Sequence, residues 1–202
     1  MKEQWYGDAR DLVKWGVLLH LADIYSIKRI LQVAYFRRSK PDYPDYIIEI
    51  DGQEHLIHKS VIKHFKSLHN IEKLSSEPRI KVIDSLFENR DQYKMVITGA
   101  ITGQHPCIVL LDPDTGLEPL SGHSKPEHVL ESELKYIWDK MHVSDVIVFY
   151  QHQTNRNGQE WIKPKREQFE KALGLPYKTV KVAYGRKIAS DVAFYYCRKE
   201  TT

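Results

Sequence analysis

A short apolar run, Cys107 to Leu111, ends abruptly in the polar sequence Asp112-Pro113-Asp114-Thr115-Gly116. Aliphatic and β-branched runs of this length, bounded by prolines, are typical of a strand that is buried on both faces of a parallel sheet. In open α/β sheets, ligands bind in the crevice outside the carboxyl ends of the strands. The run therefore predicts a buried strand with a candidate site directly after it.

Strand and helix patterns alternate along most of the chain, which favours a parallel sheet covered by helices. We expect helices at about 8–22, 60–68, 93–101, 127–141 and 164–173 from their amphipathic spacing. Residues 95–98 fit a short strand that ends at Gly99 equally well. We expect strands at 29–36, 79–84, 107–111, 145–150, 178–184 and 191–197. The last two strands have no helix-length segment between them, so they are expected to pair antiparallel. The pattern predicts a three-layer, Rossmann-like α/β fold with a mostly parallel sheet.

Residues 42–57 depart from this alternation. Two short β-rich runs flank Asp51-Gly52, a dipeptide that favours a two-residue hairpin turn. We expect a small hairpin insertion within one domain that spans residues 1–202, a length typical of a single domain.

The composition limits the classes of protein that fit this chain. Hydrophobic residues make up 42% and charged residues 28%, as in soluble globular proteins. No apolar run has the length of a membrane-spanning helix, and no signal-peptide pattern is present, so we expect a cytoplasmic protein without a membrane partner. Cys107 and Cys197 fall in expected buried strands, which indicates core thiols. Basic residues cluster at 28–40 and 163–166. Each cluster can be either a solvated face of the protein or a surface that contacts nucleic acid.

The order of elements resembles that of Rossmann-like methyltransferases. The segment Gly7-Asp8-Ala9-Arg10-Asp11-Leu12-Val13-Lys14-Trp15 is similar to the Gly-Asn-x-x-Asp-Val-Leu-Lys-His segment of the bacterial 23S ribosomal RNA adenine-N6 methyltransferase family. In that family the segment opens a helix that leads into the first strand, and an Asp-Pro-Pro-Tyr catalytic loop lies where this chain has Asp112. The resemblance implies a methyltransferase-like fold and S-adenosylmethionine as cofactor. It also implies that four residues of the first helix belong to the site: Asp8, Arg10, Asp11 and Lys14.

The chain differs from that family at two points. The family has a glycine-rich loop after its first strand, whereas residues 32–40 contain no glycine, the residue that a close backbone approach to a ligand favours. Asp114 and Thr115 stand where the family has its second proline and its aromatic residue. These differences favour a different interpretation, in which the acidic loop binds a metal.

Three carboxylates, those of Asp112, Asp114 and Glu118, are candidate ligands for Mg²⁺ or Mn²⁺. Mg²⁺ is usually bound by one or two carboxylates together with waters and substrate phosphate oxygens. A metal here predicts nuclease-like chemistry on the phosphate esters of a nucleic acid or nucleotide. The alternative is a capped turn, because Asp-Pro and Asp-x-Thr-Gly sequences form turns by themselves.

Gln151 and His152 follow the strand expected at 145–150, so they are expected at the same sheet edge as the Asp112 loop. Histidine titrates near neutral pH and can act as a general acid or base. His152 thus joins the candidate catalytic residues, which are Asp112, Asp114, His152 and Lys14.

Three cations are candidates to hold a substrate phosphate: Lys14, Arg156 and Arg186. Each also has a structural interpretation. Lys14 can pair with Asp11 three residues earlier, Arg156 can be a solvated loop residue, and Arg186 can brace a strand turn by pairing with Asp191. A third interpretation of the chain therefore remains open, in which it is a non-catalytic module that binds nucleic acid or a protein.

Overall fold

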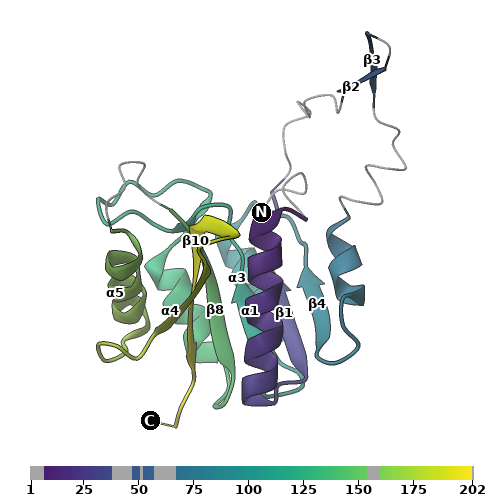
Figure 1. Cartoon of the computed structure of the whole chain (residues 1–202). Coiled ribbons are helices and arrows are strands. Elements are labelled where there is room, and N and C mark those ends of the chain that lie inside the picture. The colour runs from purple at the N-terminus through teal and green to yellow at the C-terminus, as the bar shows by residue number, and fades with distance from the viewer. Residues whose placement is uncertain (1–6, 38–46, 51, 57–66, 154–159, 202) are drawn as a thin grey trace.

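The computed structural model describes residues 7–37, 47–50, 52–56, 67–153 and 160–201. These residues form a three-layer α/β structure in which helices cover both faces of a six-stranded sheet (Figure 1). The strand order is β4-β1-β5-β8-β10-β9. The strands are β1 (Arg29–Val33), β4 (Arg79–Ile83), β5 (Ile108–Leu111), β8 (Val146–His152), β9 (Lys181–Gly185) and β10 (Ala189–Arg198). The Rossmann-like fold expected from the sequence is confirmed.

The sheet is parallel except at its C-terminal strands. β1 pairs parallel with β4 and β5, and β5 pairs parallel with β8. β10 lies between β8 and β9 and is antiparallel to both. The last two strands therefore form the antiparallel pair that their short connection predicts.

The helices separate into two layers with a hydrophobic core on each face of the sheet. Helix α1 (Ala9–Tyr25) and the 3₁₀ helix η2 (Leu68–Lys73) cover one face, where Leu18, Leu68 and Ile108 belong to one buried cluster. The other face is covered by α3 (Arg90–Ile101), α4 (Glu131–Lys140) and α5 (Ile162–Leu173). All four residues of β5 are buried, as expected for a central strand covered on both sides.

Several boundaries differ from the expectations. β1 ends at Val33, and Phe36 makes only an isolated bridge to Leu86. Helix α4 begins at Glu131 because the preceding residues form a short strand, β7 (His128–Val129), which pairs with β6 (Gly116–Leu117). β8 continues two residues beyond the expected end, since its antiparallel partner β10 pairs with it as far as His152. The helix expected at 60–68 lies almost wholly outside the described residues.

The predicted hairpin is present as a separate two-stranded sheet of β2 (Ile47–Ile50) and β3 (Gln53–Leu56). Ile50 pairs with Gln53, which leaves a two-residue connection, and Gly52 has the positive φ of 78° that such a turn favours. Within the described ranges, no helix has the length and apolar character needed to cross a membrane.

The hairpin between β9 and β10 packs closely against α1 at Gly185. A Cβ atom at Gly185 would lie 2.6 Å from Val13 Cγ2. We expect Gly185→Ala to lower the free energy of unfolding by about 1–3 kcal/mol, because the hairpin or the helix must shift to admit the methyl group. Urea unfolding measures this change.

Gly16→Ala is the matched control, since Gly16 is exposed on the same helix and a Cβ there would meet nothing within 4 Å. Alanine at this position should raise stability by about 0.5–1 kcal/mol through its higher helix propensity. Equal effects of the two substitutions would contradict the predicted contact.

Candidate functional site

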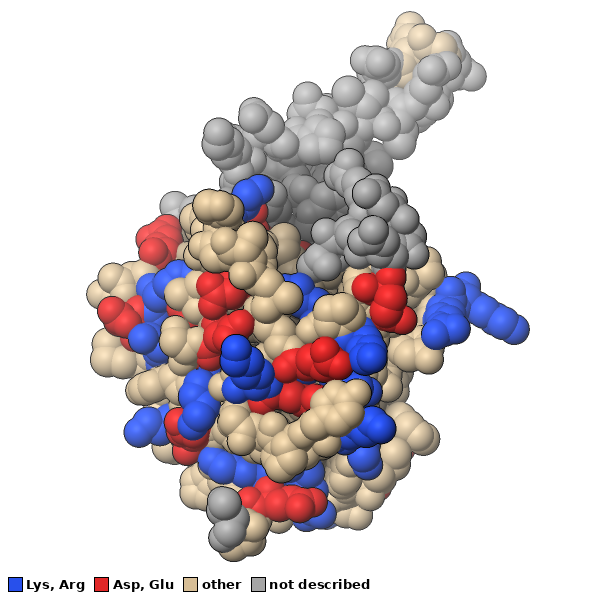
Figure 2. Space-filling model, turned by 90° about the vertical axis from the view of Figure 1, so that its left-hand side faces the viewer, with Lys and Arg blue, Asp and Glu red and all other residues tan. Residues whose placement is uncertain are grey.

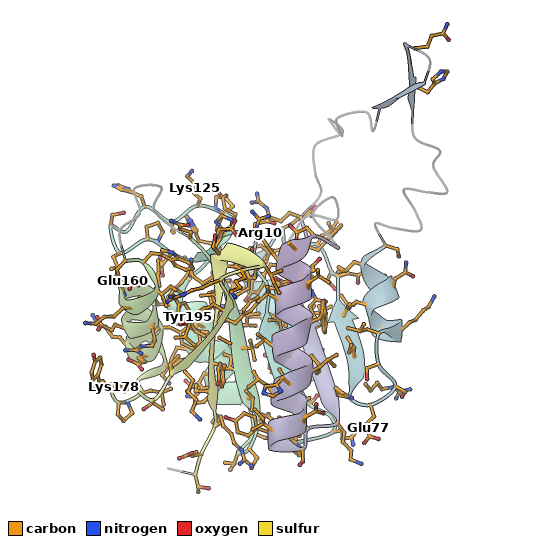
Figure 3. The ribbon with its side chains drawn as sticks, viewed as in Figure 1. Arg10, Glu77, Lys125, Glu160, Lys178 and Tyr195 are labelled. Atoms are coloured by element: carbon orange, nitrogen blue, oxygen red, sulfur yellow. The ribbon has the colours of Figure 1, made fainter. Side chains whose placement is uncertain are left out.

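A pocket of about 240 Å³ lies at the carboxyl ends of β5 and β8, next to the first turn of α1. Figure 3 labels Arg10 at this end of the helix. The lining includes seven of the residues that the sequence predicts for the site. The nine lining residues are Asp8, Arg10, Asp11, Lys14, Asp112, Pro113, Asp114, Tyr150 and His152.

The start of α1 is fixed by a side-chain cap. Asp8 Oδ1 accepts hydrogen bonds from the backbone N–H groups of Arg10 at 2.8 Å and Asp11 at 3.1 Å. A cap of this kind satisfies backbone donors that a helix leaves unpaired in its first turn. Because the cap sets where the helix begins, it also sets which of the following side chains meet the sheet.

Lys14 joins this helix to the Asp112 loop. Its ammonium nitrogen lies 2.8 Å from Asp112 Oδ2 and 2.5 Å from Asp11 Oδ1, and all three residues are buried. Gln32, in the middle of β1, donates from Nε2 to the same Asp112 oxygen at 2.7 Å. The predicted pairing of Lys14 with Asp11 is therefore confirmed, although it lies in the interior rather than on the surface.

Burial and charge act in opposite directions within this group. Burial alone would lower the pKa of Lys14, but the carboxylates of Asp112 and Asp11 raise it well above its ordinary value. Burial also raises the pKa of Asp11, and the nearby negative charge of Asp112 adds to that rise. One ammonium thus stabilises the carboxylates on both sides of it.

His152 belongs to a second charged network at the rim of the pocket. Its Nε2 atom lies 3.2 Å from Asp191 Oδ2, which also accepts hydrogen bonds from Arg10 Nε at 3.0 Å and Nη2 at 2.6 Å. Burial of Asp191 would raise its pKa, yet the bonds from Arg10 keep the pKa below its ordinary value. Asp191 therefore stays ionised and positions both side chains.

Gln151 has a structural role in the observed geometry. Its side chain is fully buried, accepts a hydrogen bond from Leu117 N at 2.9 Å and donates to the carbonyl oxygens of Thr115 and His152. Gly116 adopts a φ of 120°, and a Cβ at this glycine would lie 2.4 Å from the Gln151 amide. Gln151 thus fastens the loop after Asp114 to β8 and does not line the pocket.

Glu118 is directed away from the pocket as well. Its Oε1 atom accepts a hydrogen bond from Glu131 N at the start of α4. Its carbonyl oxygen accepts from Lys165 Nζ at 2.8 Å and from Gln168 Nε2 at 3.0 Å. The structure therefore brings Asp112 and Asp114 together and places Glu118 elsewhere.

The three cations that were predicted to bind phosphate do not lie together in one site. Lys14 is in the pocket, Arg156 lies outside the described residues, and Arg186 lines a different pocket on the β9–β10 hairpin. The predicted pair of Arg186 with Asp191 is wrong, because Asp191 binds Arg10 while Arg186 stacks over the Tyr184 ring at 4.8 Å. The competing partner comes from the opposite end of the chain.

The basic clusters seen in the sequence are largely engaged in contacts of the fold. Lys28 pairs with Glu77, and Arg37 pairs with Glu127. Lys165 is buried and binds backbone carbonyls. Figure 2 shows lysines and arginines interspersed with acidic residues over the face in view. These contacts favour the interpretation of the clusters as ordinary parts of the surface and core.

Among the described residues, one group has atoms close enough to hold a metal ion together: His105, Cys107 and Asp145, at the amino ends of β5 and β8. The Asp145 carboxylate already accepts hydrogen bonds from His105 Nδ1, Cys107 N and His142 N. Burial raises the pKa of the Cys107 thiol to about 12, so without a metal the neutral thiol is the favoured form. This group braces the strand starts, and both cysteines are free and buried as predicted.

Sequence reasoning missed three contributors to the pocket. Pro113 and Tyr150 line it, and Gln32 holds Asp112 from β1. Gln32 gave a usable signal, since a polar residue inside an otherwise apolar strand needs a buried partner. Nothing in the sequence marks Tyr150 as a pocket residue, because aromatic residues at strand ends commonly belong to the core.

The sequence matches no protein-family model, and no curated protein matches it significantly.

The ion pair between Lys14 and Asp112 makes a stability prediction. Lys14→Met leaves two buried carboxylates without their cation and should lower the free energy of unfolding by about 3–5 kcal/mol. Lys28→Met is the control, because it breaks a pair whose side chains are both mostly exposed and should cost far less stability. Adding Asp112→Asn to Lys14→Met should recover part of the loss. Similar melting temperatures for the two single variants would contradict the buried pair.

Lys165 makes a prediction about pH. Burial lowers its pKa from 10.5 to about 8, although its ammonium donates to the carbonyl oxygens of Leu117 and Glu118 and to Gln168 Oε1. Between these values the unfolded chain binds more protons, so this residue's contribution to the free energy of unfolding rises with pH. In urea unfolding from about pH 7 to about pH 9.5, the free energy of unfolding of the wild type minus that of Lys165→Met should increase.

Lys163→Met is the control for that series, because Lys163 is exposed on the same helix. This series shows how the stability changes with pH when an exposed lysine of α5 is removed instead of a buried one. A constant difference between the wild type and Lys165→Met would show that the pKa of Lys165 is not lowered.

Proposed function

We propose that this protein is a relative of the S-adenosylmethionine-dependent nucleic-acid methyltransferases and that its target amine enters the Asp112 pocket. The observation that carries the proposal is the contact of Lys14 with Asp112 at 2.8 Å. These residues belong to the two separate segments that resemble one methyltransferase family, and 98 positions separate them in the chain. Their meeting in one pocket supports a shared function rather than two unrelated similarities.

The charge of the pocket supports a cationic or hydrogen-bond-donating ligand. Four carboxylates line it, against the two cations Arg10 and Lys14, and each cation is already paired with aspartates. A phosphate group would meet net negative charge here. An amino group of a base, or the sulfonium and ammonium groups of S-adenosylmethionine, would meet favourable charge.

Asp112 has an oxygen suited to an amine. Its Oδ2 atom accepts from Lys14 and Gln32, whereas no described residue donates to Oδ1. A substrate amino group could donate a hydrogen bond to Oδ1 without displacing the ion pair. The neighbouring Tyr150 ring and Pro113 supply apolar surface for a flat base.

The turn after β1 fits a methyltransferase-like cofactor loop despite its lack of glycine. Tyr35 takes a φ of 46°, in the left-handed region that glycine favours. Its ring is buried and packs against Phe87 and Tyr93, with ring centroids 5.1 Å apart in each pair. The chain therefore retains a left-handed turn here while placing the side chain in the core. S-adenosylmethionine would supply an electrophilic methyl group at this end of the sheet.

Metal-dependent phosphate-ester chemistry remains a second candidate, supported by the carboxylates of Asp8, Asp11, Asp112 and Asp114 in one pocket. It would require a divalent ion to compete with the ammonium of Lys14 for Asp112. Glu118, the third predicted ligand, binds the start of α4 instead. The geometry therefore favours the first candidate.

Thermal melting with S-adenosylmethionine tests the proposal. A ligand that binds only the folded state stabilises it by about 2.7 kcal/mol at a concentration 100 times its Kd, so the melting temperature should rise. Asp114→Asn should weaken binding about tenfold, because it removes a charged group that faces the cationic ligand. Glu118→Gln is the control and should bind as the wild type does.

The same assay separates the two candidates. A stabilisation by Mn²⁺ that is lost in Asp112→Asn and Asp114→Asn, without any response to S-adenosylmethionine, would overturn the methyltransferase proposal and favour phosphate-ester chemistry. Methyl transfer to mixed oligonucleotides, followed with a radiolabelled methyl group, then tests the activity directly.

A further inference from the structure

A second pocket, of about 380 Å³, lies on the β9–β10 hairpin beside the start of α5. Its size falls in the range of small-molecule sites. Aromatic, polar and cationic side chains line it together. The lining residues are Gln153, Glu160, Trp161, Ile162, Tyr184, Arg186, Ala189, Ser190 and Val192.

The two pockets adjoin across the ends of β8 and β10. His152 lines the first pocket and the next residue, Gln153, lines the second. Gln153 N donates to Asp191 O at 2.8 Å, and Asp191 binds His152 while its neighbour Ser190 lines the second pocket. The two pockets are therefore lined from neighbouring positions of the same strand pair.

The second pocket offers a flat stacking surface. The guanidinium carbon of Arg186 lies 4.8 Å from the centre of the Tyr184 ring, and Tyr184 is 44% exposed. Arg186 also donates from Nη2 to the Tyr184 hydroxyl at 3.4 Å, which keeps the two groups together. Exposed tyrosine rings and arginine guanidinium groups are the side chains on which proteins stack unpaired bases, and Tyr184 and Arg186 supply one of each here.

The charge of the second pocket differs from that of the first. Arg186 forms no ion pair with any residue in the described ranges, whereas the Glu160 carboxylate is occupied by the backbone N–H groups of Ile162 and Lys163 at the start of α5. Arg186 lies in the hairpin turn that Ile188 N closes onto Gly185 O at 2.9 Å. A phosphate, which the acidic first pocket disfavours, thus finds a cation next to it.

We infer that the second pocket binds the nucleotide next to the target in a single-stranded nucleic acid, with its base on Tyr184 and Arg186. This inference rests on the proposed function for the identity of the group in the first pocket. The substrate would then be an unpaired strand rather than a free nucleotide or a protein side chain.

Fluorescence anisotropy with labelled ten-residue oligonucleotides of mixed sequence tests the inference, in RNA and DNA arms at low and moderate salt. Tyr184→Ala and Arg186→Ala should each weaken binding about tenfold, as loss of a stacked base does. Lys187→Ala is the matched control, since it removes a cation from the same turn without touching the stack, and it should change binding less than threefold. Tyr184→Phe retains the ring and should bind like the wild type.

The absence of binding to any oligonucleotide at low salt would overturn the inference. So would binding that Tyr184→Ala and Arg186→Ala leave unchanged while the melting temperatures of both variants match that of the wild type. A loss that is equal in Lys187→Ala would indicate only general charge attraction and would also overturn it. If only the proposed function is wrong, the result is a different one. Oligonucleotide binding then still depends on Tyr184, and S-adenosylmethionine gives no thermal shift. Preference for the RNA or the DNA arm identifies the kind of strand.

Discussion

The ammonium of Lys14, buried between Asp11 and Asp112, is the contact on which the arrangement of the site depends. A charge removed from water is tolerated only when its partners are close and well placed. This requirement fixes the position of α1 relative to the end of β5. Once the helix is fixed there, Asp8 and Arg10 in its first turn lie at the rim of the pocket, and Arg10 reaches Asp191 on the last strand.

The features that the sequence predicted well are those set by local pattern. The start of the first helix at Asp8, the buried run that became β5 and the Asp-Gly hairpin each depend on neighbouring residues, and each is present. The location of the site also followed from a local argument, because the carboxyl ends of parallel strands lie at one edge of a sheet. This reasoning brought Asp112 and His152 to the same pocket correctly.

The parts that the sequence did not predict depend on partners far away in the chain. Gln151 was expected in a loop, but pairing with β10 extends β8 through it, and its amide then meets the turn at Gly116. Glu118 follows Asp114 closely in sequence, yet the short β6–β7 pairing carries it to the start of α4. Arg186 lost Asp191 to Arg10, which lies 181 positions from that carboxylate. Adjacency in sequence does not predict such competition.

The two pockets differ in charge, so they suit different parts of a nucleotide. A nucleotide combines a flat base that carries hydrogen-bond donors with an anionic phosphate, and one pocket rarely suits both. Here the carboxylates gather in the pocket where the base amine would react. The guanidinium of Arg186, which forms no ion pair with any described residue, lies in the second pocket over the Tyr184 ring. Attraction at one end and repulsion at the other would orient a strand so that the base, and not its phosphate, enters the Asp112 pocket.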